Sequence, residues 1–326
     1  MKKKSVAVAY PTIPIIFLGG IHQDRTPIYD TMGLAVTSEN EVTRTETSVE
    51  IIPKDQLPKD EPLPYVKFML GDKEITGIRG KQIISAVKSF MQNCKREANL
   101  LINSKNYDIF SGSSDSGLAA LFTALNDLLD LNLNQEKLLE YSMRGSESAG
   151  RSLFGGLTHT LATTPPKVVQ LASESDLNEI KLFSVPFHYK SRITADEIHA
   201  GIVTNSNFEK RKENIPLWVN RIKAALANNN LVDLLEIAEE NIQNAHELLE
   251  GVGLVVRKPK MMELCIDIQQ MREDGIPAYY LIGGGNLITI ATLQQYAQQV
   301  AKRLDSKNWQ YHHFKVASAP KIVQSK

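Results

Sequence analysis

Apolar and polar residues alternate along the chain with two distinct periods. In the first part of the chain, Val, Ile and Thr recur at every second position, which is typical of strands. This period predicts strands at 5–9, 13–18, 33–36 and 43–52, and a hairpin at 65–76 after a charged linker that runs to Pro64. Helical spacing takes over at Gly80 and predicts a helix as far as Leu101, where a strand at 100–103 begins.

The rest of the chain mixes the same two patterns. Apolar stripes at helical spacing predict helices at 118–129, 133–143, 207–228, 231–250, 259–273 and 292–303. Short apolar runs predict strands at 157–162, 168–172, 181–187, 278–282, 287–291 and 311–317. Because strands and helices gather in separate blocks, the sequence favours α+β domains over a doubly wound sheet.

Length and charge limit the class of protein. A chain of 326 residues is long for a single core and predicts two domains. Basic and acidic residues balance, with 37 of each, and this neutrality argues against a protein that binds nucleic acid or a membrane surface, because those partners need a basic excess. We therefore expect a small-molecule substrate.

Two features bear on the cellular compartment. Cys94 and Cys265 lie in apolar helical patterns and are expected to be buried free thiols in a reducing compartment. The apolar run after the basic N-terminal residues resembles a signal peptide, but Pro11 and Pro14 interrupt it, so a buried strand is expected instead. Since no other stretch is long and apolar enough to span a bilayer, we expect a cytoplasmic protein.

The stretch from Ser111 to Gly117 is the first candidate for a ligand-binding site. Its small residues run directly into the helix predicted from Leu118, which places free backbone N–H groups and the positive end of a helix at one point. Such a point suits a phosphate group. A serine-rich turn that only caps the helix is an alternative interpretation, because the stretch matches neither the Walker A motif nor G-x-G-x-x-G.

Two further segments rich in Gly and Ser lie at 145–156 and 283–286. Glycine lets a ligand approach the backbone closely, although turns and a bulge explain these glycines as well. Glu147 and Arg151 are spaced i and i+4, so a helix there would project both side chains into one cleft. The arginine could grip a carboxylate or phosphate and the glutamate could orient a hydroxyl, unless the two form an ordinary surface pair.

Patterns typical of metal sites are absent from the sequence. The seven histidines show no spacing such as H-E-x-x-H, and an exposed or strand-packed position is expected for each. Asp108, Asp115 and Asp196 could contact Mg²⁺, although single aspartates more often face solvent or cap a helix.

The segment 145–156 carries a family resemblance. The diphosphomevalonate decarboxylases, members of the GHMP kinase superfamily, carry G-S-G-S-A-C-R-S-L-F-G-G, and this chain resembles that motif at ten of twelve positions with G-S-E-S-A-G-R-S-L-F-G-G. The stretch 113–121 resembles the end of the family's phosphate loop. Residues 9–20 and 278–286 fall where its first strand and its late glycine motif belong, so the resemblance spans the chain.

Three departures from the decarboxylase pattern are informative. The family's K-Y-W-G-K run is replaced by Phe17-Leu18-Gly19-Gly20-Ile21, which removes both lysines that would neutralise a 5-diphosphate. The aspartate of the late F-D-A-G-P-N motif becomes Ile282, which cannot accept a proton, and a glycine becomes Glu147. These changes, together with Arg25-Thr26-Pro27, resemble the mevalonate 3-kinases of thermoacidophilic archaea, which phosphorylate the tertiary hydroxyl of mevalonate.

The resemblance implies a GHMP kinase fold of the α+β class. Residues 1–178 would form a ribosomal protein S5 domain 2-like N-terminal domain with the phosphate loop and the substrate motif, and residues 179–326 a ferredoxin-like C-terminal domain. The implied activity is ATP-dependent and Mg²⁺-dependent phosphorylation of the 3-hydroxyl of mevalonate in an archaeal-type mevalonate pathway, by an enzyme that is commonly a homodimer.

The resemblance also implies roles for individual residues. The nucleotide phosphates would be bound by Ser111, Gly112, Ser113, Ser114 and Asp115. The substrate would be bound by Leu18, Glu147, Ser148, Arg151 and Arg192, with Glu147 and Arg151 as the catalytic pair.

Three other functions stay open on the sequence. A decarboxylase of the same family, acting on a phosphorylated mevalonate, would require His22 and Arg25 to replace the missing lysines. A catalytically silent relative would bind nucleotide or a protein partner without turnover. A GHMP kinase for a different hydroxy acid also fits, because an apolar pocket discriminates by only about 1–3 kcal/mol per methylene.

Overall fold

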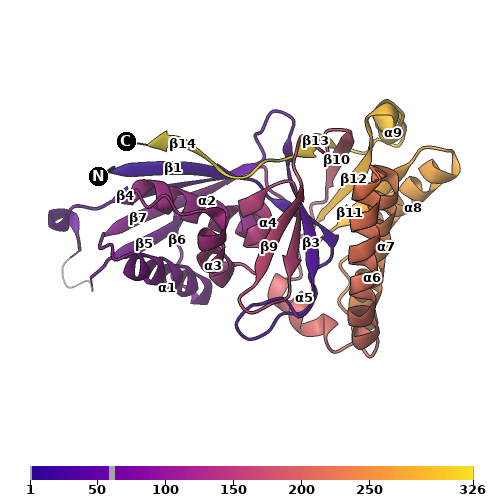
Figure 1. Ribbon diagram of the computed structural model, residues 1–326. Coiled ribbons are helices and arrows are strands. Elements are labelled where there is room, and N and C mark those ends of the chain that lie inside the picture. The colour runs from indigo at the N-terminus through magenta and orange to yellow at the C-terminus, as the bar shows by residue number, and fades with distance from the viewer. Residues whose placement is uncertain (1, 59–62, 326) are drawn as a thin grey trace.

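A computed structural model describes residues 2–58 and 63–325, which form two β-sheets covered by helices (Figure 1). The strands are β1 (Lys4–Ala9), β2 (Thr12–Ile16), β3 (Thr31–Ser38), β4 (Arg44–Ile51), β5 (Val66–Leu70), β6 (Lys73–Glu74), β7 (Leu100–Tyr107), β8 (Leu157–Leu161), β9 (Lys167–Ala172), β10 (Ile180–Pro186), β11 (Ala278–Ile282), β12 (Leu287–Leu293), β13 (His312–Val316) and β14 (Lys321–Ser325). The α-helices are α1 (Ile78–Asn93), α2 (Ser113–Leu128), α3 (Gln135–Gly145), α4 (Ala149–Phe154), α5 (Ala195–Ile202), α6 (Phe208–Ala227), α7 (Leu231–Gly251), α8 (Pro259–Glu273) and α9 (Ala297–Ser306).

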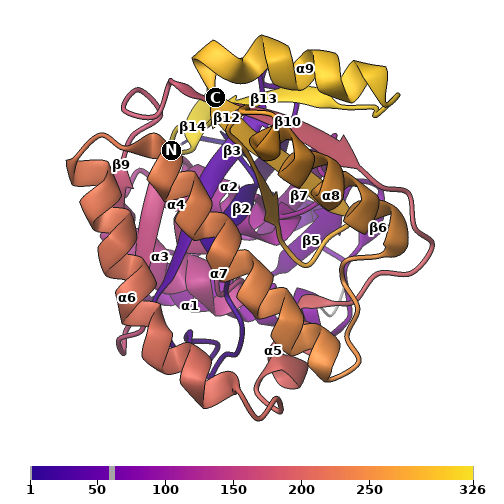
Figure 2. The same ribbon diagram turned by 90° about the vertical axis from the view of Figure 1, so that its right-hand side faces the viewer.

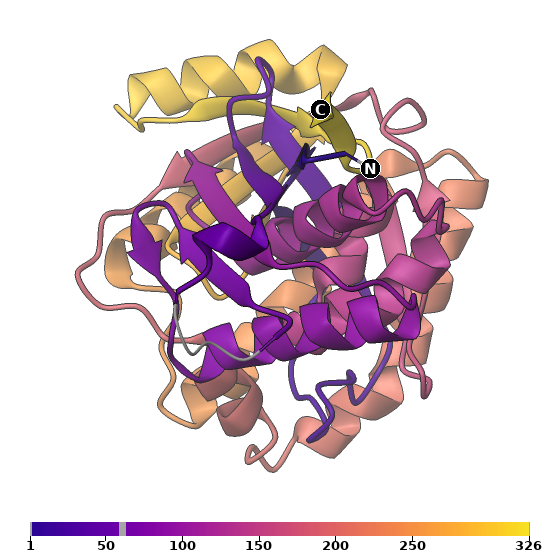
Figure 3. The same ribbon diagram turned by 90° about the vertical axis from the view of Figure 1, so that its left-hand side faces the viewer.

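The first sheet has six strands in the order β14–β1–β4–β7–β5–β6. Along β4, Thr45, Thr47 and Val49 are buried, and the residues between them are half-buried or exposed. This two-residue alternation leaves one face of the sheet for a core and the other for solvent. Helices α2, on β1 and β4, and α1, on β5, cover the apolar face, as the view from that side of the molecule shows (Figure 3).

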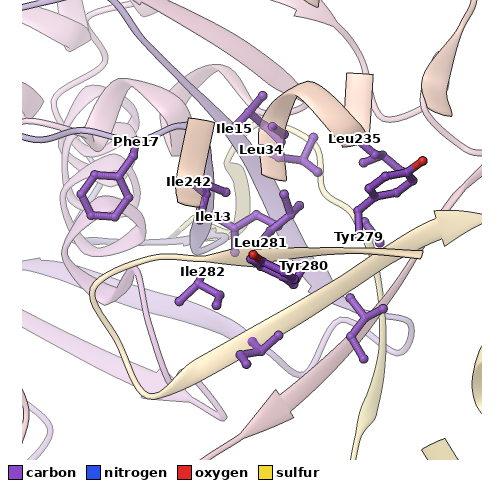
Figure 4. Packing of buried hydrophobic residues seen from close by; sticks show 14 of the residues in the cluster. Ile13, Ile15, Phe17, Leu34, Leu235, Ile242, Tyr279, Tyr280, Leu281 and Ile282 are labelled. Carbon is purple, nitrogen blue, oxygen red and sulfur yellow. The ribbon is translucent and has the colours of Figure 1, made fainter. Parts of the chain in front are cut away.

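The second sheet has eight strands in the order β11–β12–β10–β13–β3–β8–β9, with β2 paired to β3. Every residue of β2 and β11 is buried. Helix α7 packs on β2, β11 and β12 and against α6, whereas α8 packs on β11 and α9 on β12 (Figure 2). Ile13 and Ile15 of β2 lie near Leu235 and Ile242 of α7 in this core (Figure 4). Among the described strands, β5 and β7 alone pair in parallel.

The two sheets do not follow the order of the chain. β14 pairs with β1, so the two ends of the described chain lie side by side (Figure 1). Strands β3, β8 and β9 come before residue 178 but join the sheet that contains β10–β13. Both sheets therefore take strands from either side of the domain boundary predicted at residue 178, and that boundary stays a prediction.

The helix expected at 118–129 begins earlier, at Ser113. Two further predicted helices also have the wrong limits. The helix expected from Gly80 to Leu101 ends at Asn93, because Lys95 has a φ of 51° and the chain then enters β7. The helix expected from Thr292 begins at Ala297, because Thr292 still pairs with Ala278 and Lys181 inside the sheet. In both places β-pairing with distant strands overrides local helical spacing.

The structure also contains elements that the sequence patterns did not reveal. These are the short helices α4 and α5 and the edge strand β14. The predicted strand 100–103 extends to Tyr107, because β7 pairs with β4 along its whole length. Residues 59–62 of the proline-punctuated linker, with Met1 and Lys326, lie outside the described residues.

Both cysteines are free in the described chain, as predicted. Cys265 is buried in α8, and burial raises the pKa of its thiol to about 12. Cys94 is only half-buried at the end of α1, so the prediction of a buried thiol is wrong for this residue. No helix in residues 2–58 and 63–325 has both the length and the apolar character needed to cross a bilayer.

Candidate active site

A pocket lies where α2, α4 and α5 converge with the end of β2 and the β11–β12 turn. It encloses about 690 Å³ of space free of atoms, part of it continuous with solvent. Its lining includes all three segments rich in Gly and Ser that the sequence singled out. The predicted site residues in this lining are Leu18, Ser111, Gly112, Ser114, Asp115, Glu147, Ser148, Arg151 and Arg192. Ser113 instead lines an adjoining apolar pocket on the other side of the α2 start.

The Ser111 loop enters α2 through a left-handed residue. Gly112 is the residue before the helix and has a φ of 74° and a ψ of 17°. The first N–H groups of any α-helix have no partner inside the helix, and in α2 they belong to the residues that follow Gly112. Because Ser111, Gly112 and Ser114 line the pocket, these donors and the positive end of a 16-residue helix lie at its wall, an arrangement that suits a phosphate.

Gly112 offers a direct test of this loop. A methyl group at Gly112 would lie 2.8 Å from the backbone nitrogen of Thr12, and the positive φ is unfavourable for alanine. We expect Gly112→Ala to raise KM for ATP about tenfold, which corresponds to ~1.4 kcal/mol of lost binding. Steady-state kinetics with varied ATP measures this.

The matched control is Gly71→Ala. Gly71 also has a positive φ, 60°, but no atom lies within 4 Å of the position its Cβ would occupy. The two variants share the backbone strain and differ in the collision with Thr12. Equal KM values for ATP in both variants would contradict a phosphate-binding role for the Gly112 turn.

Asp115, in the first turn of α2, is the centre of a buried cluster of hydroxyl groups. Its Oδ1 accepts hydrogen bonds from Ser146 Oγ at 3.1 Å and Ser148 Oγ at 2.5 Å, and its Oδ2 accepts one from Thr12 Oγ1. Asp115 is only 5% exposed. The carboxylate thereby ties the Ser111 loop to the segment before α4 and to β2. Thr12 and Ser146 lie in segments that carry the family resemblance, but neither was predicted as a site residue.

Arg151, in α4, is a buried cation with free donors. Its side chain lies over Gly33 of β3, where any Cβ would collide with the arginine Cδ. In the described part of the chain nothing accepts a hydrogen bond from its Nε and Nη2 atoms, although both are buried. Burial lowers the pKa of Arg151, and the nearby charges of Asp115 and Glu147 oppose that effect. Arg151 also lines the pocket, so an anionic ligand there would pair with its charge.

Glu147 precedes α4 and lies in a turn, because the helix begins at Ala149. Glu147 and Arg151 therefore do not share a helix face, but both side chains reach the same pocket, as the i, i+4 spacing would have predicted for a helix. Glu147 Oε2 accepts hydrogen bonds from Arg25 Nη2 at 2.6 Å and Nε at 3.1 Å, and Oε1 pairs with His199 Nε2 at 3.2 Å. Glu147 is not an ordinary surface pair with Arg151, since it is 4% exposed.

The charge of Glu147 is fixed by its neighbours. Burial would raise the pKa of this carboxyl, but the hydrogen bond with His199 and the positive charge of Arg25 outweigh burial and hold the pKa well below its usual range. Glu147 is thus a stable anion and a weak base. It is suited to accept a hydrogen bond from a hydroxyl and to orient it.

The remaining predicted residues line the pocket in different ways. Leu18 is buried just after β2, whereas Arg192 is exposed in the loop before α5. The glycine turn 283–285 approaches the Ser111 loop so closely that a Cβ at Gly285 would lie 2.9 Å from Ser111 Oγ. His22 is exposed and is not part of the pocket lining. The roles of these residues stay predictions.

Several polar residues have other surroundings than the sequence predicted. His199 and His246 are buried on helices α5 and α7, so the expected exposed or strand-packed position is wrong for both. Nothing in the sequence set His199 apart, whereas Arg25 belongs to the Arg25-Thr26-Pro27 resemblance.

Asp196 pairs with Arg25 at 3.2 Å, and Asp108 does not line the pocket. Among the described residues, no three His, Cys, Asp or Glu side chains form a metal cluster.

Comparison with known families gives two matches along the chain. Residues 9–167 match the model of the diphosphomevalonate decarboxylase-like N-terminal domain. Residues 193–297 match the model of the mevalonate-3-kinase C-terminal domain.

Individual relatives cover nearly the full length. The chain is 29% identical over 324 residues to a mevalonate-3-kinase of Picrophilus torridus, a match that covers 97% of this chain and 96% of the relative. It is 28% identical over 286 residues to the mevalonate 3-kinase of Thermoplasma acidophilum, with 86% of each chain covered.

Solved structures agree with the fold. The mevalonate-3-kinase of Thermoplasma acidophilum, solved with mevalonate 3-phosphate and ADP bound, superimposes with a TM-score of 0.87 at 24% identity over 100% of both chains. The mevalonate diphosphate decarboxylase of Staphylococcus aureus gives a TM-score of 0.87 at 20% identity over 99% of both chains. The predicted α+β GHMP kinase fold is confirmed. Because the two family models together span most of the sequence, this chain belongs to the mevalonate-3-kinase and diphosphomevalonate decarboxylase-like family of the GHMP kinase superfamily.

Proposed function

We propose that this protein transfers the γ-phosphoryl group of ATP to the 3-hydroxyl of mevalonate, giving mevalonate 3-phosphate and ADP in isoprenoid biosynthesis. The observation that carries this proposal is the buried guanidinium of Arg151, with two unpartnered donors, beside the anionic Glu147 and across from the phosphate loop. Both curated kinases to which the chain is similar over most of its length act on mevalonate.

The arginines of the pocket suit the carboxylate of a hydroxy acid. A guanidinium presents parallel N–H donors that match the two oxygens of a carboxylate. Arg151 supplies such donors from the buried wall, and Arg192 adds an exposed cation at the mouth. With the carboxylate held there, Glu147 would accept a hydrogen bond from the 3-hydroxyl, on the carbon two bonds away.

The pocket is poorly equipped for a 5-phosphorylated substrate. Arg25, which could have replaced a missing lysine, is committed to Glu147 at 2.6 Å and Asp196 at 3.2 Å. Near it, Phe17, Leu18 and Ile198 give the lining an apolar character. Ile282, in place of the decarboxylase aspartate, is completely buried in the core and does not line the pocket (Figure 4). These features favour phosphorylation of unphosphorylated mevalonate over decarboxylation.

The phosphates of ATP would lie at the Ser111–Asp115 loop, and the nucleoside would lie in the adjoining apolar pocket. That pocket begins at Ser113 and Gly117 of α2 and is lined by apolar side chains of β5, α1 and the turn between them, including Phe68, Ile75 and Ile83. Both carboxylates in the main pocket are hydrogen-bonded, Glu147 to Arg25 and His199 and Asp115 to three hydroxyl groups. Because the partners of Asp115 are neutral, Asp115 would be the one to face a cation. Bound with ATP, Mg²⁺ supplies charge neutralisation of the phosphates.

In this reaction the phosphoryl group passes directly from ATP to the hydroxyl, so the protein forms no covalent bond with either substrate. The bond between the γ-phosphorus and the β–γ bridging oxygen breaks, a bond from that phosphorus to the 3-hydroxyl oxygen forms, and ADP leaves. Catalysis of this kind depends on positioning and on stabilising charge. Glu147 would orient the hydroxyl, and the hydroxyl proton would pass to solvent, because a carboxylate with a lowered pKa does not retain it.

One assay separates the candidate functions. With ATP, Mg²⁺ and mevalonate, we expect ADP and a new phosphate ester on C3 in equal amounts, without release of carbon dioxide. With mevalonate 5-phosphate, we expect kcat/KM at least about tenfold lower, because Arg25 is paired with two carboxylates and Arg151 and Arg192 would hold the substrate carboxylate. Phosphorus NMR locates the ester, and trapped carbon dioxide measures decarboxylation.

The outcomes against the proposal are equally definite. Carbon dioxide released as fast as ADP is formed would indicate a decarboxylase. Tight ATP binding without ADP formation would indicate a silent relative. The homodimer and the cytoplasmic location implied by the family resemblance stay predictions.

A further inference from the structure

Arg211, in the first turn of α6, is an unusual buried cation. Its side chain is 1% exposed, and among the described residues no carboxylate lies within ion-pair distance of it. Its five N–H groups instead donate to five neutral oxygens. A charge held without a counter-ion in the interior is costly, and an apolar side chain of similar volume would often be as stable. The arrangement therefore needs a reason beyond packing.

The oxygens around Arg211 belong to the groups that hold the segment 17–20. Arg211 Nη2 donates to the Phe17 carbonyl at 3.3 Å and to Asn241 Oδ1 at 3.1 Å, and Nε donates to Tyr29 Oη at 3.1 Å. Tyr29 Oη in turn donates to the Phe17 carbonyl at 3.1 Å. The guanidinium also lies 5.5 Å from the centre of the Tyr29 ring, which fixes the ring as well as its hydroxyl.

Segment 17–20 relies on this cluster for its backbone hydrogen bonds. It follows the end of β2, and Phe17 and Leu18 line the pocket. The N–H of Phe17 donates to Asn241 Oδ1 at 2.9 Å, and the N–H of Gly19 donates to Tyr29 Oη at 3.0 Å. A Cβ at Gly19 would lie 2.8 Å from that oxygen, so the contact leaves no room for adjustment.

The same segment reaches Glu147 through one histidine. The N–H of Gly20 lies 3.3 Å from His199 Nδ1. Since a backbone N–H can only donate, Nδ1 is the acceptor, and the ring proton is on Nε2, which donates to Glu147 Oε1 at 3.2 Å. A displacement of Gly20 would therefore remove a hydrogen bond that holds the His199 ring and, with it, the contact of that ring with Glu147.

We propose that Arg211, acting through Tyr29 and Asn241, is a positioning residue that fixes segment 17–20, so that Leu18 and, through Gly20 and His199, Glu147 are held in the geometry that phosphoryl transfer requires. Arg211 itself does not line the pocket. The part of this inference that concerns turnover rests on the proposed function. The part that concerns the order of segment 17–20 does not.

Two variants test the proposal. Tyr29→Phe removes only the hydroxyl shared by Gly19, Phe17 and Arg211, and Arg211→Met removes the cation at similar volume. We expect kcat to fall about tenfold or more in each, with KM for ATP within twofold of the wild type, because the phosphate loop is held by separate contacts. Amide hydrogen exchange in peptides that span 15–22 is expected to rise by at least about tenfold.

Arg272→Met is the control for loss of a half-buried, hydrogen-bonded arginine. Arg272 is paired with Glu239 and the Ala278 carbonyl, and none of the three lines the pocket. We expect this variant to melt earlier but to keep kcat and the exchange rate of 15–22. If Arg211 had a purely structural role, the melting temperature would fall in Tyr29→Phe, Arg211→Met and Arg272→Met alike. None of the three would then show a lower kcat with an unchanged KM for ATP.

The results overturn the proposal if folded Tyr29→Phe keeps wild-type kcat and wild-type exchange at 15–22, or if Arg272→Met loses kcat as strongly. Should Arg211→Met fail to fold, Tyr29→Phe alone decides. Should the wild type not phosphorylate mevalonate, the proposed function fails, and the exchange measurement still decides whether Arg211 and Tyr29 order the segment.

Discussion

Replacement of Arg151 by methionine is expected to lower kcat/KM for mevalonate about a thousandfold. Two hydrogen bonds from a buried guanidinium to a carboxylate are each worth ~2 kcal/mol, and ~4 kcal/mol corresponds to about three powers of ten. KM for ATP should change little, because the phosphate loop is built from α2 and Arg151 belongs to α4. Steady-state rates of ADP formation with varied mevalonate measure the effect.

The fold should survive this substitution. The carboxylates near Arg151 keep their other partners: Asp115 retains three hydroxyl donors, and Glu147 retains Arg25 and His199. Methionine also removes the cost of burying a charge.

Arg257→Met is a matched control, since Arg257 is buried and paired with Glu250 away from the pocket. Arg151→Lys should recover only part of the activity, because an ammonium lacks the forked donors. A wild-type kcat/KM for mevalonate in Arg151→Met would show that Arg151 does not bind the substrate carboxylate.

Replacement of Glu147 by glutamine is expected to lower kcat about a hundredfold. The amide keeps the size of the side chain but loses the negative charge that orients the hydroxyl and neutralises Arg25. The effect should be at the lower end of the 10²–10⁴ range for a positioned acid–base group, because phosphoryl transfer depends chiefly on geometry and charge. Single-turnover formation of the C3 phosphate ester reports the chemical step directly.

Glu239→Gln provides the control, since Glu239 is a buried carboxylate paired with Arg272 outside the pocket.

A second measurement on Glu147→Gln is its thermal stability as a function of pH. Because the pKa of Glu147 is lowered in the folded protein, its ion pair stabilises the fold above the ordinary carboxyl pKa of about 4.3, and this contribution is lost as the pH falls below that value. The melting temperatures of wild type and Glu147→Gln should thus differ more at pH 7 than at pH 3. Unchanged kcat would show that no carboxylate is needed at this position.

Local patterns predicted the elements well where the chain makes its own contacts. The long apolar stripes of α6, α7 and α8 matched their observed bounds within a few residues. The patterns failed where a distant partner decides. Thr292 is a strand residue because Ala278 and Lys181 pair with it, and β14 is a strand because β1 offers a free edge. Pairing of this kind has no signature within a window of ten residues.

The candidate site divides in the same way. Ser111, Glu147 and Arg151 stood out because small residues flank them and because segment 145–156 resembles a family motif. Arg25 and His199, the partners of Glu147, were not recognised as such. They lie 122 and 52 residues away from it along the chain, and only folding brings the three together.

The sequence by itself determined the α+β class and the family, and it singled out the Ser111 loop and the Glu147–Arg151 segment as candidates, because these depend on residue types at short spacing. Three features depend on the tertiary structure alone: the lowered pKa of Glu147, the ion pairs of Arg25 with two carboxylates, and the lack of partners for two Arg151 donors among the described residues. The physical reason is that charge and hydrogen-bond satisfaction depend on burial and on neighbours from remote segments, which no local pattern records.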